Sequence, residues 1–116
     1  MFGMVRRENP GEREKTRMFF NSRGKYIAAE IEGRLYSAAG RHVGRRVDKY
    51  GIFVDLAGRY LGEILCANRL ARNRGSRFLQ TSFGACKHAE ARPAVARPRD
   101  YSPVILPPGY EDVDVS

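Results

Sequence analysis

Basic side chains stand beside four glycines of this chain, and ring-bearing side chains follow most of them. The basic residues are Arg23, Lys25, Arg41, Arg59 and Arg74, and the ring-bearing neighbours are Tyr26, His42 and Tyr60. Arginine and lysine contact phosphate groups, and aromatic rings stack on nucleobases. The pattern therefore predicts a site for an anion or a nucleic acid. Charged residues at solvent-exposed turns are also ordinary, so the pattern alone leaves that alternative open.

Catalysis and metal binding have less support in the residue types. The chain has two histidines, His42 and His88, and its carboxylates are scattered, so no nucleophile–base pair is indicated. The two cysteines, Cys66 and Cys86, could join these histidines around zinc, but the spacing matches no zinc signature. We therefore expect a protein that is not an enzyme and that has no metal site and no cofactor.

The elements that would position the basic residues are indicated by a glycine repeat of about 17 residues. The glycines are Gly24, Gly40, Gly58 and Gly75. Asn21, Ser37 and Asp55 stand three residues before the first three of them, whereas Arg72 takes this place in the fourth copy. Asn, Ser or Asp opening a type I turn that a left-handed glycine closes is typical of a three-residue hairpin loop with a bulge. Each copy is therefore predicted to form one β-hairpin.

Two apolar columns flank these turns and predict which residues face each other across each hairpin. The expected pairs are Phe19 with Ile27, Leu35 with Val43, Phe53 with Leu61, and Leu70 with Phe78. The pairs next to them are Phe20 with Tyr26, Tyr36 with His42, Val54 with Tyr60, and Ala71 with Arg77. The following position is small in three copies, namely Ala28, Gly44 and Gly62, which predicts close backbone approach there.

A single short hairpin cannot bury its apolar face, so the four copies are expected to pack together. The predicted fold is all-β, with four hairpins in a pseudo-fourfold, closed or near-closed arrangement, because closure removes exposed strand edges. We expect a polar lead-in over residues 1–17, the hairpin domain over residues 18–83, and an Ala/Arg/Pro-rich linker with an acidic, proline-rich tail over residues 84–116. Both terminal segments are predicted to be flexible.

The short repeat of Gly, Arg or Lys, Tyr or His, an aliphatic residue, and Gly or Ala resembles that of the four-fold β-flower proteins, small bacterial proteins of uncharacterised function. The likeness covers residues 18–82 and extends to the ending "LPPGYEDV". It implies a pseudo-fourfold all-β fold, and it supplies no catalytic residues.

Charge and composition bear on partners and location. Residues 18–82 hold 12 basic and five acidic residues, a net charge of +7, whereas residues 101–116 carry a net charge of −3. The tail combines these acids with apolar residues, and Val104, Ile105, Leu106 and Tyr110 are its candidate docking residues. We expect a binding or assembly module that uses the tail, with a protein partner or self-association. The alternative is a nucleic-acid-binding or other polyanion-binding module. No membrane span is indicated, and the two cysteines favour a cytoplasmic location.

Overall fold

The structure of the protein is a computed structural model that describes residues 16–92 and 97–115. Of the predicted N-terminal lead-in, only Thr16 and Arg17 are described, and they begin the first strand. The strands are β1 (Thr16–Phe20), β2 (Tyr26–Ile31), β3 (Arg34–Ser37), β4 (His42–Val47), β5 (Ile52–Asp55), β6 (Tyr60–Leu65), β7 (Arg69–Asn73) and β8 (Tyr110–Asp112). Within these ranges the chain forms no helix that is long and apolar enough to cross a membrane.

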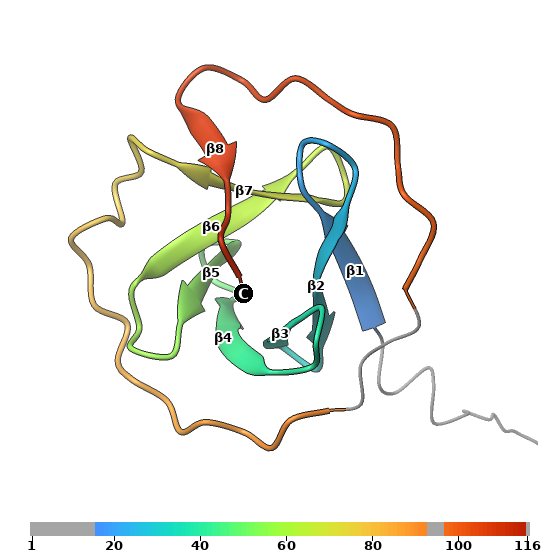
Figure 1. Cartoon of the computed structure of the whole chain (residues 1–116). Helices are drawn as coiled ribbons and strands as arrows, with labels where there is room; N and C mark the ends of the chain where they lie inside the picture. The colour runs from blue at the N-terminus through green and yellow to red at the C-terminus, as the bar shows by residue number, and fades with distance from the viewer. Residues whose placement is uncertain (1–15, 93–96, 116) are drawn as a thin grey trace, which may run out of the picture.

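Seven of the strands close into a barrel. Neighbours in sequence pair antiparallel from β1 to β7, and a parallel contact between Phe20 of β1 and Arg69 of β7 joins the two ends of the sheet. The eighth strand, β8, pairs antiparallel with β7. Figure 1 shows these strands arranged around a common centre, with the segment that follows β8 drawn toward the middle of the view. The predicted all-β class and the predicted closure are confirmed.

Three of the four hairpin turns form as the sequence predicts. Gly24, Gly40 and Gly58 have φ values of +87°, +92° and +89°, and such left-handed conformations favour glycine. Each of these glycines donates its amide to the carbonyl of the turn-opening residue, Asn21, Ser37 or Asp55, at 2.9–3.0 Å. The side chain of Asp55 also accepts the amides of Ala57 and Arg59, both at 3.0 Å.

The predicted register is right for one set of pairs and shifted for the other. Phe20 pairs with Tyr26, Tyr36 with His42, and Val54 with Tyr60, as expected. In the second set, each partner lies one residue beyond the predicted one. Phe19 pairs with Ala28 and not Ile27, Leu35 with Gly44 and not Val43, and Phe53 with Gly62 and not Leu61. A register shift lies between the two pairs of each hairpin, so one residue of the returning strand bulges out. The bulge residues still pack against the core.

The predicted fourth hairpin is wrong. The returning partner of β7 is β8, so Ala71 lies opposite Asp112 and not Arg77. Gly75 is not among the glycines with positive φ, and Asn73, one residue after the expected position, accepts the Gly75 amide at 2.9 Å. Arg72 cannot open such a turn because its side chain carries donors only.

The core explains why the C-terminal segment displaces residues 76–80 from β7. Val113 and Val115 are buried in one cluster with the apolar residues of β1, β3, β5 and β7, namely Phe19, Leu35, Phe53 and Leu70. Phe78, which was predicted to face Leu70, instead covers a second cluster that contains Val54 and Tyr60. Pairing β7 with β8 buries two valines in addition to forming the ladder, and buried apolar area is the larger stabilising quantity.

Close backbone approach at the small positions is confirmed. A Cβ atom added at Gly62 would lie 2.8 Å from the carbonyl oxygen of Ala71 in the next strand, and one added at Gly44 would overlap the carbonyl oxygen of Val54. Larger side chains at these two positions would push β4 from β5 and β6 from β7.

Residues 83–92 and 97–109, between β7 and β8, run around the outside of the barrel and are called the belt below. Figure 1 shows it running outside the strands from the yellow to the red part of the chain. At three turns a belt amide donates to the carbonyl of the turn glycine: Phe83 to Gly58, Arg92 to Gly40 and Tyr101 to Gly24, each at 2.9 Å. The sequence predicted a linker and a flexible tail in this region. The sequence did not indicate that the carbonyls of the turn glycines would accept hydrogen bonds from this segment.

Candidate functional site

The turns present their basic residues in two different states. Arg23, Arg41 and Arg74 are exposed, and no carboxylate among the described residues pairs with them. Lys25 donates to Asp100 of the belt at 2.7 Å, and Arg59 lies 3.9 Å from the carboxylate of Asp55 in its own turn. Both of these pairs are largely exposed, and such pairs contribute little to stability.

The belt brings further cations to the same turns. Its backbone hydrogen bonds to the glycine carbonyls bring the belt, and with it further basic residues, to the turns. The combined set is called the basic rim: Arg23, Lys25, Arg41, Arg59 and Arg74 from the turns, with Lys87, Arg97 and Arg99 from the belt. Lys87 and Arg99 are exposed and are not paired with any carboxylate that the structure describes. Arg97 lies 3.9 Å from Asp100.

The rings predicted to accompany these cations are buried. Tyr26 and Tyr60 are 5% exposed and His42 is 2% exposed, so none offers a free face to a ligand in this structure. Tyr60 donates its hydroxyl to Glu63 at 2.8 Å and accepts the amide of Asn73 at 2.9 Å. Burial raises the pKa of Tyr60 well above its usual range. The Tyr60 and His42 rings thus contact both strands and belt, and Tyr26 packs among strand residues.

His42 joins the belt to the barrel through both ring nitrogens. Its Nδ1 accepts the amide of Ala89 at 2.9 Å, so Nε2 carries the proton and donates to the carbonyl of Gly44 at 2.9 Å. The pKa of His42 is lowered from its ordinary value. Burial is the largest cause, because the charged form of the ring loses its hydration. The ring of His88 stands edge-on to it at a centroid distance of 5.8 Å.

A cavity of about 420 Å³ opens beside His42. Its polar lining residues include Arg41, His88, Asp55 and Asp114. Two carboxylates and two basic groups oppose one another there, so the lining does not select one sign of charge. Tyr26, whose hydroxyl lacks a hydrogen-bond partner among the described residues, borders a neighbouring apolar cavity of about 470 Å³.

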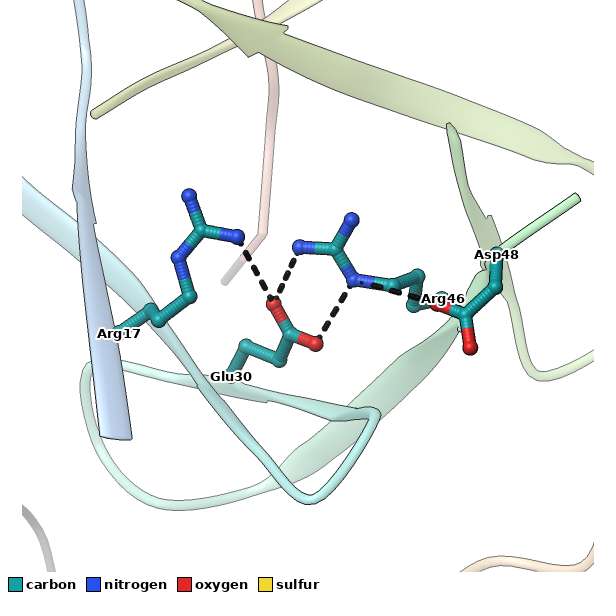
Figure 2. A network of polar contacts seen from close by, with 4 residues as sticks. All are labelled: Arg17, Glu30, Arg46 and Asp48. Atoms are coloured by element: carbon teal, nitrogen blue, oxygen red, sulfur yellow. Dashed lines mark hydrogen bonds and ion pairs between the residues drawn. The ribbon is translucent and has the colours of Figure 1, made fainter. Parts of the chain in front are cut away.

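A charged network at the far ends of the strands, away from the turns, was not indicated by the sequence. Figure 2 shows the guanidinium groups of Arg17 and Arg46 directed at the carboxylate of Glu30. Arg46 of β4 donates twice to Glu30 of β2, at 2.6 and 2.8 Å, and Arg17 lies 4.0 Å away. Arg46 also lies over the ring of Phe53, 5.0 Å from its centroid. Every oxygen of this buried carboxylate faces a cation, so the network fixes β2 against β4.

The predicted docking residues of the tail lie in different surroundings. The amide of Val104 donates to the carbonyl of Ser22 at 2.8 Å, whereas Ile105 is 97% exposed. Leu106 is half-buried, and Tyr110 begins β8 and donates its hydroxyl to Glu63 at 3.1 Å. Asp112 accepts from both the amide and the hydroxyl of Ser22 at 2.7 Å. The structure thus seats this segment on the barrel of its own chain.

Two tyrosines that the sequence did not single out are exposed beside cations. Tyr50, between β4 and β5, is 40% exposed, and Tyr101 of the belt is 50% exposed. The signal for Tyr50 was its place after Lys49 in a predicted loop, but no repeat column contains it. Tyr101 belongs to the belt, whose path has no sequence signature.

In the described part of the chain, no three His, Cys, Asp or Glu side chains lie closely enough together to hold a metal ion. Both cysteines are free. Comparison of this chain with protein-family models, with curated proteins and with solved structures returns no match.

Proposed function

We propose that this protein is a non-enzymatic binding module whose ligand is nucleic acid, held by its phosphates on the basic rim. The observation that carries the proposal is the difference between the acids and the bases. Glu30 and Glu63 are held in internal contacts, while Arg23, Arg41 and Arg74 have no carboxylate partner in the described residues. Asp55 and Asp100 pair with Arg59 and Lys25, and the remaining cations give the rim an excess of positive charge, which attracts polyanions.

The acidic tail supports the same proposal over that of a free docking segment. Glu111 and Asp112 contact Arg72 and Ser22 of the chain's own barrel, and β7 supplies the ladder partner of β8. A protein partner that used Tyr110 or the acidic residues would have to displace β8, which leaves Ile105 as the exposed apolar residue of the tail. The rim cations need no such rearrangement. The pseudo-fourfold arrangement and the relation to the β-flower proteins stay predictions.

The test is the salt dependence of binding. The triple change Arg23→Ala, Arg41→Ala and Arg74→Ala removes three cations that make no described ion pair, so the fold should be retained. Each lost phosphate contact lowers the slope of log K against log salt by about 0.7–0.9, so the triple variant should lose about 2 to 3 from it. Fluorescence anisotropy with a labelled oligonucleotide over a range of salt concentrations measures the slope.

The matched control is Arg34→Ala, which removes an exposed cation at the start of β3 that does not adjoin a turn glycine of the basic rim. The control should leave the slope unchanged. An unchanged slope in the triple variant would exclude the rim as the site. Absence of binding even at low salt would exclude nucleic acid as the ligand.

A further inference from the structure

Exposed large apolar side chains are few in the described residues, and two of the three are tyrosines beside cations. They are Tyr50, Tyr101 and Ile105. The Lys49 ammonium lies 5.5 Å and the Arg77 guanidinium 5.7 Å from the ring centroid of Tyr50. An exposed ring that is accompanied by a cation is the combination that single-stranded nucleic acid uses, because the base stacks and the phosphate pairs.

The ring of Tyr50 is held by its neighbours. Phe78 packs on it at a centroid distance of 4.9 Å and Phe83 at 6.0 Å. Together with Arg77 these rings line a cavity of about 300 Å³, at the small end of the range for ligand sites. The Arg77 guanidinium also lies 4.7 Å from the centroid of Phe78. This volume suits a single planar group.

The Tyr50 site lies at the other end of β5 from the Gly58 turn, and Phe83 of the belt connects the two. Phe83 donates its amide to the carbonyl of Gly58, the residue before Arg59. The Arg45 guanidinium donates to the carbonyl of Phe83 at 2.6 Å and fixes this part of the belt to β4. A nucleic-acid strand bound at Arg59 that follows the belt past Phe83 therefore reaches the ring of Tyr50.

Tyr101 repeats this arrangement at another turn. Its amide donates to the carbonyl of Gly24, next to Arg23 on the rim. Its ring packs on Phe20 at 4.4 Å, and the guanidinium of the buried Arg69 lies 5.6 Å from its centroid. Arg69 donates to the carbonyl of Ser102 at 2.8 Å, which holds the belt in place here.

Further cations line the hollow beside Tyr101. A cavity of about 430 Å³ is bordered by this ring together with Arg17 and Arg99. Arg99 is exposed and makes no ion pair with a described carboxylate, so it is available to a phosphate. The two sites thus share an exposed, packed ring and an adjoining cation.

We propose that the ligand of the basic rim is single-stranded nucleic acid, with one base stacked on Tyr50 and another on Tyr101. The proposal rests on the proposed function and specifies its ligand. Duplex nucleic acid keeps its bases stacked inside the helix and cannot use the two rings. A cationic ligand is disfavoured because the chain's own cations already adjoin both rings. Since packing already restrains the rings, stacking costs little side-chain entropy.

The test compares three polyanions: a single-stranded oligonucleotide of about 16 nucleotides, its duplex, and heparin, which has no bases. Tyr50→Ala and Tyr101→Ala should each weaken single-strand binding about tenfold. The affinity for duplex and heparin should change less than twofold. Tyr50→Phe should bind like the unaltered protein, because it keeps the ring. The matched control is Ile105→Ala, which removes an exposed apolar side chain that has no aromatic ring and should leave the affinity for all three polyanions unchanged.

Tyr101→Ala also removes a contact with Phe20, so thermal unfolding is measured alongside binding. Should that variant unfold, Tyr101→Leu keeps an apolar contact without an aromatic face, and it should show the same loss of single-strand affinity. If neither tyrosine substitution changes the affinity for the single-stranded oligonucleotide, the stacking proposal is overturned and the rim proposal stays intact. A protein that binds none of the three polyanions overturns both.

Discussion

Gly58→Ala separates the role of the belt from that of the turn. Gly58 and Gly33 both have positive φ, at +89° and +82°, so alanine brings a similar left-handed strain at either position. At Gly33 a new Cβ would meet nothing within 4 Å, whereas at Gly58 it would lie 2.6 Å from the amide nitrogen of Gly84. The belt must then move away from the turn. Gly33→Ala is the matched control.

The expected difference follows from the contacts at this turn. The left-handed strain costs about 1–2 kcal/mol in either variant. Moving the belt also breaks the bonds from Phe83 to Gly58 and from Cys86 to Leu56, both 2.9 Å. Each contributes about 1 kcal/mol. Gly58→Ala should therefore lower the free energy of unfolding by about 3–4 kcal/mol and Gly33→Ala by about 1–2 kcal/mol.

Urea unfolding followed by circular dichroism measures both values, provided that the m-values agree. Gly84→Ala tests the belt side, because Gly84 also has positive φ (+85°) and open space around its Cβ position. It should behave like Gly33→Ala. Equal losses for Gly58→Ala and Gly33→Ala would refute the close contact between belt and turn.

The remaining predictions concern pH, the C-terminal strand and the buried network. His42 has a lowered pKa in the fold, so its contribution to stability is present above about pH 6.5 and is lost as the pH falls and the unfolded chain takes up the proton. His42→Gln should flatten this part of a stability–pH curve. Val113→Ser should lower the thermal midpoint strongly, because this side chain is 7% exposed, whereas Ile105→Ser at 97% exposure should not. Glu30→Gln should cost about 3 kcal/mol in urea unfolding because Arg46 loses its bidentate counter-charge and keeps only the exposed Asp48 at 3.7 Å. Glu30→Leu with Arg46→Leu should recover much of that loss.

The three regular hairpins could be predicted because their determinants are local. An Asn, Ser or Asp and a glycine three residues later define each turn, and both the acceptor and the left-handed φ lie within that stretch. The pairs that adjoin the turns followed from it. A second bulge lies beyond these pairs, at Ile27 and its equivalents, and is distinct from the bulge of the turn itself. It could not be predicted, since it depends on how these side chains pack in the closed barrel.

The candidate site could be predicted only in part. The cations beside the turn glycines follow from the turns, because side chains next to a tight loop face solvent. Whether the neighbouring rings are exposed depends on what covers them, and Tyr60 is buried while Tyr50 is not. The belt decides this, through contacts between residues far apart in the chain.

The sequence by itself determined the all-β class and the turn chemistry, since both depend on neighbours within a few residues. Only the tertiary structure decided the partner of β7. Residues 76–80 follow β7 directly, so closing a hairpin with them would cost less chain entropy than recruiting β8 across a long loop. That cost grows only slowly with loop length, whereas Val113 and Val115 join the central core cluster and Phe78 and Leu79 of the nearer segment still cover a different one. The distant strand prevails because the closed barrel, and not the local chain, provides the cavity that those two valines fill.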